Sequence, residues 1–161
     1  MKRFAEKANY FDTLVHPAKS QAEIVEMLED FGADSIMMMQ GQAGGKHAWL
    51  IRFHWEDKSY RFAFVPLVCE NPDGERSFGG KRRTYLEQSR YQMGRIAVNF
   101  VKGILTAAEA QPGALFGFLE LPAKAGEAIP PVASELDVTI LTQKSLMPEF
   151  PQFVEGEFRE S

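Results

Sequence analysis

The clearest chemical signal in the sequence is a block of arginine and lysine inside an acidic chain. The 161 residues carry a formal net charge of −4, yet residues 76–102 hold seven basic side chains against the single acid Glu87. Such blocks are typical of surfaces that contact phosphate, because the planar guanidinium fork matches a phosphate group. The candidate residues for binding nucleic acid or a partner protein are Lys81, Arg82, Arg83, Arg90, Arg95 and Lys102.

The basic block also has a second interpretation, as a solvated helix face paired with the acids of the same chain. Residues 1–75 hold 8 basic and 12 acidic side chains, and residues 111–161 hold 3 and 8. We expect residues 81–83 at the start of a helix, where cations oppose the helix dipole. A purely stabilising sequence would place acids there, so this detail favours the binding interpretation.

The residues that could carry catalysis are few and scattered. Of the three histidines, His16 precedes a proline in an expected loop, His47 is at the very start of an expected strand, and His54 lies on the polar face of that strand. Either strand histidine could act as a general base, but no metal-binding spacing of histidines is present. Cys69 has no clear histidine or aspartate partner in the sequence. We therefore expect no catalytic residue, no metal and no cofactor.

Composition limits the class of protein. Apolar residues make up 45% of the chain, as in ordinary globular domains. The single cysteine excludes a disulfide framework within the chain and any multi-cysteine metal site. The apolar runs are too short to span a bilayer, and the first residues do not resemble a signal peptide. We expect a cytoplasmic protein that does not contact membranes.

The first half of the chain predicts one helix and three strands. The helix runs over Gln21–Phe31, with Ser20 as its N-cap and a glycine stop after it. A short apolar run then predicts a strand at Ile36–Gln40, and alternating aromatic and branched residues predict antiparallel strands at Ala48–Trp55 and Tyr60–Val65.

The second half predicts a polar loop over Val68–Gly80 and a long helix over Arg82–Ala110. Gly94 and Gly103 lie within that helix, where we expect them to mark a close approach to another element. A short helix over Ala114–Leu121 follows. The stripe of the long helix that we expect to be buried consists of Tyr85, Ser89, Met93, Ile96, Phe100, Ile104 and Ala107.

The resulting fold class is α+β: a helix, a three-stranded antiparallel meander and a long helix, in the order αβββα, with the helices covering one sheet face. We assign this core to residues 1–121. Residues 122–161 form an acidic, proline-rich extension that we expect to wrap around the core. This extension is irregular, although Leu136–Leu141 alternates and could add an edge strand.

Several segments resemble a family of small uncharacterised proteins encoded by bacteriophages and prophages. The resemblance covers roughly residues 19–120 and rests on Lys19–Ile24, Phe31–Asp34 and the strand ending Arg61–Pro66. In the long helix, the family pattern Arg-x6-Lys-x2-Leu-x-Ala-x-Glu falls on Arg95, Lys102, Leu105, Ala107 and Glu109. The chain departs from that pattern at Gly94, Ile104 and Thr106, which weakens any shared charged site. The resemblance implies an origin in a mobile element and brings no activity with it.

Three functions stay open at this point. The first is a non-catalytic accessory protein of a phage or mobile element, which contacts nucleic acid or a nucleic-acid-processing complex through the basic block. The second is an inhibitor or adaptor that binds a host protein complex, suggested by the acidic ends of the chain. The third is a small nuclease that depends on His47 or His54.

Overall fold

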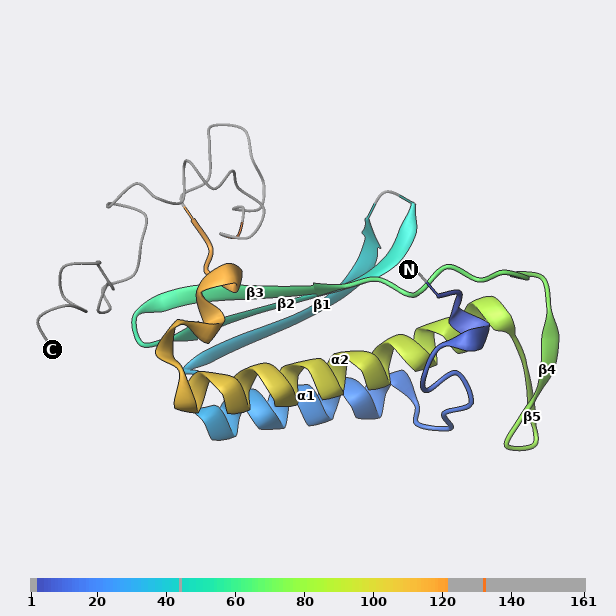
Figure 1. Ribbon diagram of the computed structural model, residues 1–161, viewed down its shortest axis with the longest axis horizontal. Coiled ribbons are helices and arrows are strands. Elements are labelled where there is room, and N and C mark those ends of the chain that lie inside the picture. Colours follow the sequence, from blue (N-terminus) through green and yellow to red (C-terminus); the bar gives the residue numbers. More distant parts are fainter. Residues whose placement is uncertain (1–2, 44, 122–131, 133–161) are drawn as a thin grey trace, which may run out of the picture.

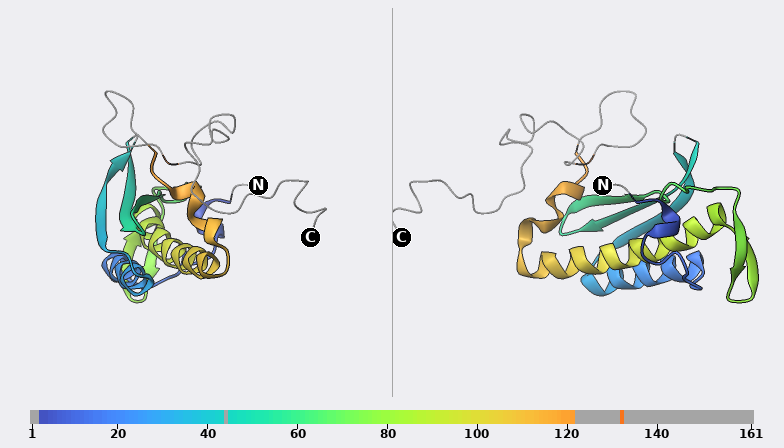
Figure 2. Two further views of the ribbon diagram at one scale, coloured as in Figure 1. Left: turned by 90° about the vertical axis from the view of Figure 1, so that its left-hand side faces the viewer. Right: turned by 45° about the vertical axis from the view of Figure 1, so that its right-hand side comes forward.

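The computed structural model describes residues 3–43, 45–121 and 132 and shows two layers, a sheet and a pair of helices that cover one of its faces (Figures 1 and 2). The predicted α+β class is confirmed. The elements are η1 (Ala5–Lys7), α1 (Pro17–Phe31), β1 (Ser35–Ala43), β2 (Lys46–Trp55), β3 (Lys58–Phe64), β4 (Glu75–Phe78), β5 (Lys81–Thr84), α2 (Tyr85–Ala110) and η2 (Pro112–Phe118).

The main sheet is the antiparallel meander that the alternation predicts, with strand order β1-β2-β3. Ile51 in β2 lies opposite Met38 in β1 and Phe62 in β3. β2 and β3 are joined by Glu56 and Asp57, both with positive φ, as a tight two-residue hairpin turn requires. β1 ends three residues later than predicted, at Ala43, and β2 begins two residues earlier, at Lys46, so the connection between them is shorter than expected.

α1 begins four residues earlier than predicted, and Ser20 is not its N-cap. The cap is His16, whose Nδ1 accepts a hydrogen bond from the Ala18 N–H at 3.0 Å. Pro17 follows as the first helical residue, where its fixed φ and missing N–H cost nothing. Ser20 is fully buried one turn further on. Gly32 ends the helix in the left-handed region, with φ of 106°, as predicted.

The predicted polar loop is confirmed over residues 68–74 but is wrong from Glu75 onward, and the long helix starts later than predicted. β4 and β5 form a second, two-stranded sheet, joined by Gly79 and Gly80 at φ of 58° and 87°. α2 starts only at Tyr85, after the N-cap Thr84, whose Oγ1 accepts from the Glu87 N–H at 3.1 Å. Residues 81–83 therefore lie on β5, and the argument from the helix dipole does not apply to them.

The buried face of α2 is rotated from the predicted stripe. Ser89 and Met93 are buried as expected, but Phe100 is 38% exposed. The helix packs against α1 as well as the sheet, so its buried face follows two neighbours. Its buried residues are Gln88, Ser89, Gln92, Met93, Gly94, Ala97, Val98, Val101, Leu105 and Ala108.

The two glycines of α2 have different surroundings. A Cβ built on Gly94 would lie 2.9 Å from Ser20 Oγ in α1, so the predicted close approach is confirmed there. A Cβ on Gly103 would meet nothing within 4 Å, so the same expectation is wrong for Gly103.

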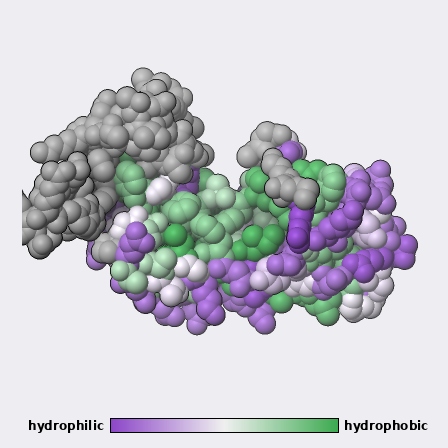
Figure 3. Space-filling view, viewed as in Figure 1, coloured by the Kyte–Doolittle hydropathy of each residue, from purple (hydrophilic) through white to green (hydrophobic). Residues whose placement is uncertain are grey.

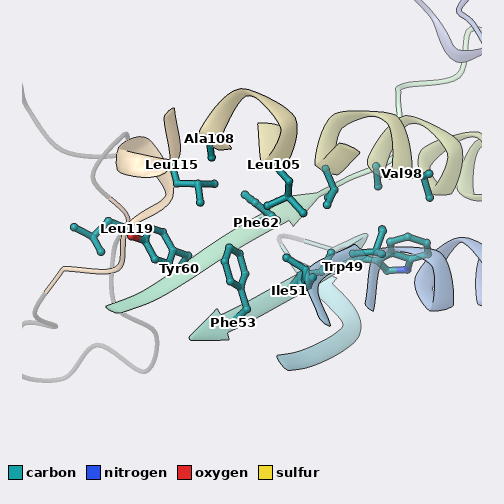
Figure 4. Packing of buried hydrophobic residues seen from close by; sticks show 14 of the residues in the cluster. Trp49, Ile51, Phe53, Tyr60, Phe62, Val98, Leu105, Ala108, Leu115 and Leu119 are labelled. Atoms are coloured by element: carbon teal, nitrogen blue, oxygen red, sulfur yellow. The ribbon is translucent and has the colours of Figure 1, made fainter. Parts of the chain in front are cut away.

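The main core lies between the sheet and the two helices and closes under η2 (Figure 4). Ile51 and Phe62 extend from the sheet towards Leu105 of α2 and Leu115 of η2. The predicted short helix near residue 114 is this 3-10 helix. A separate small cluster of Ala5, Phe11 and Phe78 joins η1 to the β4–β5 hairpin.

The predicted extension, residues 122–161, and its possible strand Leu136–Leu141 fall outside the described residues, apart from Val132. The backbone of Val132 forms an antiparallel bridge with Glu120. Among the described residues, no helix is long and apolar enough to cross a bilayer.

Candidate nucleic-acid interface

The fold gives the six candidate residues different roles, and Arg95 is the most clearly structural of them. It lies between the two helices, where Nη1 is 2.8 Å from Glu23 Oε2 and 3.4 Å from Ser20 Oγ. Only 20% of its side chain is exposed. Arg76, which belongs to the same sequence block, pairs with Asp12 and lies over the Phe78 ring. These two residues match the alternative in which the block pairs with the chain's own acids.

Arg83 is also engaged within the molecule. Its guanidinium lies 4.0 Å from the centroid of the Tyr91 ring, and Nη1 donates to Gln88 Oε1 at 3.0 Å. Gln88 in turn donates to the carbonyl oxygens of Phe11 and Thr13. Arg83 therefore helps to hold the N-terminal segment against α2, and its charge has no carboxylate partner within the described part of the chain.

Lys81, Arg82 and Arg90 remain exposed at the end of the molecule where β5 leads into α2 (Figure 1). Arg82 Nε lies 3.7 Å from Glu75 Oε2, but 69% and 49% of these side chains are exposed. An exposed pair at this distance is worth little and exchanges readily with other partners. In residues 3–43, 45–121 and 132, no carboxylate lies within 4 Å of Lys81 or Arg90. Figure 3 shows hydrophilic side chains gathered at this end.

Lys102 lies apart from the other exposed cations, in the second half of α2. It borders a shallow hollow together with Asp30 of α1 and Glu109 of α2. Because two acids share this hollow, Lys102 does not extend a continuous basic surface.

The structure adds one residue that the sequence analysis missed. Lys46, at the start of β2, lines a cavity of about 300 Å³ together with His47 and Arg90. Lys46 falls between the predicted strands Ile36–Gln40 and Ala48–Trp55, and no spacing along the chain links it to α2. We call Lys46, Lys81, Arg82 and Arg90 the basic end.

The two histidines considered for catalysis do not meet. His54 Nδ1 lies 2.7 Å from Asp34 Oδ1 near the end of β2, whereas His47 is near its start. Seven residues of strand separate them by about 23 Å. Burial raises the pKa of the Cys69 thiol, which makes it a poor nucleophile at neutral pH. In the described part of the chain, no three potential ligands among His, Cys, Asp and Glu gather to hold a metal ion.

The sequence matches no protein-family model, no curated protein and no solved structure. The resemblance to phage and prophage proteins therefore stays a prediction.

Proposed function

We propose that this protein is a non-catalytic accessory protein of a phage or other mobile element that binds nucleic acid through the basic end. The observation that carries the proposal is the exposure of Lys81, Arg82 and Arg90 at one end of the molecule, without a strong ion-pair partner among the described residues. The protein's net charge of −4 gives no general attraction for a polyanion, so binding would depend on this local surface.

The chemistry of the basic end suits the phosphate backbone better than the bases. Lysine and arginine contacts to phosphate release counterions and provide affinity without reading sequence. The hairpin tip carries two of the cations on a two-stranded sheet that projects beyond α2 (Figure 1). We therefore expect binding with little sequence preference and strong dependence on salt.

Fluorescence anisotropy with labelled single- and double-stranded DNA and RNA tests the proposal. We expect the slope of log K against log salt to be about −3 to −4 between roughly 50 and 200 mM salt, if the four cations of the basic end each contact one phosphate. The double variant Lys81→Glu/Arg82→Glu should lower the affinity at low salt at least tenfold, or roughly 1.4 kcal/mol. Both residues are exposed, so circular dichroism should show an intact fold.

Lys58→Glu/Lys102→Glu is the matched control, because it changes the net charge equally at exposed positions outside the basic end. Its affinity should fall much less. The proposal is wrong if the unmodified protein binds none of the four nucleic acids at low salt. It is equally wrong if the two double variants lose affinity to the same extent.

A further inference from the structure

The cavity beside the basic end is built from three separate parts of the chain. The start of β2, the segment between β3 and β4, and the first turns of α2 each provide part of its wall. Its volume of about 300 Å³ is at the lower end of the range for small-molecule sites. The lining residues are Gly45, Lys46, His47, Pro66, Leu67, Val68, Cys69, Pro72, Leu86 and Arg90.

The charged side of this cavity is entirely basic. Lys46 and Arg90 supply two permanent positive charges, and none of the described residues that line it is acidic. The carboxylate of Glu6 lies close enough to influence one lining residue, since its negative charge contributes to the raised pKa of Cys69. Its oxygens are already occupied by the N–H groups of Glu70 and Asn71, at 3.0 and 2.7 Å.

The pKa of His47 responds to the positive charge at the cavity. Burial lowers its pKa, and the nearby Arg90 charge lowers it further. His47 is therefore mostly neutral at physiological pH and can donate one N–H. An anion placed between Lys46 and Arg90 would relieve the repulsion and favour protonation of His47.

The cavity also has an aliphatic wall, which includes Pro66, Val68 and Leu86. Val68 and Leu86 are 59% and 50% exposed, so the cavity has an apolar rim accessible to a ligand. No Phe, Tyr or Trp is among the described residues that line the cavity, so it offers no large ring on which a base could stack.

We propose that this cavity binds a terminal phosphate, the phosphate monoester of a free nucleotide or of the 5′ end of a nucleic-acid strand. A monoester carries a charge of about −1.5 to −2 at pH 7, which matches the two cations better than the single charge of a backbone diester does. The remaining volume admits a sugar against the aliphatic wall. Binding of the 5′ end of a strand rests on the proposed function, whereas binding of a free nucleotide does not.

The test compares four probes: inorganic phosphate, the nucleoside 5′-monophosphates, and one short single strand with either a 5′-phosphate or a 5′-hydroxyl. NMR follows the His47 ring, and anisotropy follows the strands. We expect the phosphorylated strand to bind about tenfold more tightly than the hydroxyl strand. The pKa of His47 should rise when phosphate or any nucleoside monophosphate binds, with little preference for the base.

Lys46→Gln and Arg90→Gln should each abolish the preference for the 5′-phosphate, and Lys58→Gln should not. Lys46, Arg90 and Lys58 are all exposed, so these changes should leave the fold intact. Equal affinity of the two strands, together with an unchanged His47 titration in phosphate, overturns the inference.

The outcomes also separate the inference from the proposed function. If the 5′-phosphate and 5′-hydroxyl strands bind with equal affinity, but the Lys81→Glu/Arg82→Glu variant no longer binds either strand, the proposed function stands and the inference fails. If nucleoside monophosphates bind and raise the His47 pKa but no strand binds, the proposed function fails and the cavity is a nucleotide site.

Discussion

Gly94 of α2 lies so close to Ser20 of α1 that a Cβ on Gly94 would be 2.9 Å from Ser20 Oγ and 3.0 Å from Ser20 Cβ. Trp49 of the sheet closes the third side, 3.3 Å from the same point. The helices can therefore approach each other at this level only because residue 94 has no side chain.

Gly94→Ala should destabilise the protein, because the added methyl group must displace either α1 or the Trp49 ring. Overpacking of this kind costs roughly 1–3 kcal/mol, despite the better helix propensity of alanine. Urea unfolding measures the change. Gly103→Ala in the same helix faces open space and should stabilise the protein by up to about 1 kcal/mol. If both variants shift stability in the same direction, the proposed contact with Ser20 is not what constrains Gly94.

The sequence was sufficient to predict the three-stranded sheet, though not the β4–β5 hairpin, because alternation along a strand depends only on which face is buried. It was not sufficient to predict the buried face of α2. Gln88 and Gln92 are polar, so a hydrophobic pattern placed them on the outside. In the structure both side chains are fully buried, since each donates two hydrogen bonds to backbone carbonyls of the N-terminal segment. Hydropathy carries no signal for a polar residue buried by distant backbone partners.

Gln92→Leu should release the N-terminal segment from α2. Gln92 Nε2 donates to the carbonyl oxygens of Ala5 and Asn9, both at 2.9 Å, and leucine would leave these acceptors without their donor. The expected loss is roughly 1–3 kcal/mol of unfolding free energy. Hydrogen exchange should show reduced protection of the Ala5 amide, which bonds to the Val68 carbonyl. Gln42→Leu, at an exposed position, is the control. Unchanged exchange at Ala5 would contradict this prediction.

The pair Arg52–Glu120 should stabilise the attachment of the segment after η2 to the sheet. Arg52 donates from Nε and Nη2 to the two Glu120 oxygens, at 2.6 and 2.7 Å, and the Glu120 side chain is only 5% exposed. Glu120→Gln should cost about 2 kcal/mol, less than for a fully buried pair because a third of Arg52 is exposed. Loss of the Glu120 charge also leaves Arg52 next to the like charge of Arg61, its cross-strand neighbour.

Chemical unfolding of Glu120→Gln, Arg52→Lys and the exposed control Glu26→Gln measures this effect. Arg52→Lys retains the charge but not the paired N–H donors, so it should also destabilise the protein. Stability equal to that of the control in both variants would show that the pair contributes nothing.

For the candidate site, the sequence alone could show that basic residues gather in one segment, but not which of them stay exposed. The arginines and lysines of residues 76–102 are contiguous in sequence, yet Arg95 pairs with Glu23 and Lys102 lies beside Asp30 and Glu109. Which cations remain exposed depends on acids that the fold brings from other elements. Lys46 could not be linked to Arg90 for the same reason, because only tertiary structure places β2 opposite α2.

The depressed pKa of His47 makes the stability of the protein depend on pH in a defined direction. Burial and the Arg90 charge oppose protonation of His47 in the folded state, whereas the unfolded chain takes up the proton near the usual pKa of about 6.5. The unfolded state therefore binds more protons as the pH falls through this region, and stability decreases. Above that pH both states are neutral at His47 and the effect vanishes.

His47→Gln should lose less unfolding free energy than the unmodified protein between pH 7.5 and pH 5. Arg90→Gln should raise the His47 pKa, as read from its ring resonances by NMR. If His47→Gln and the unmodified protein lose equal stability over this range, His47 does not feel the burial and the charge that the cavity imposes.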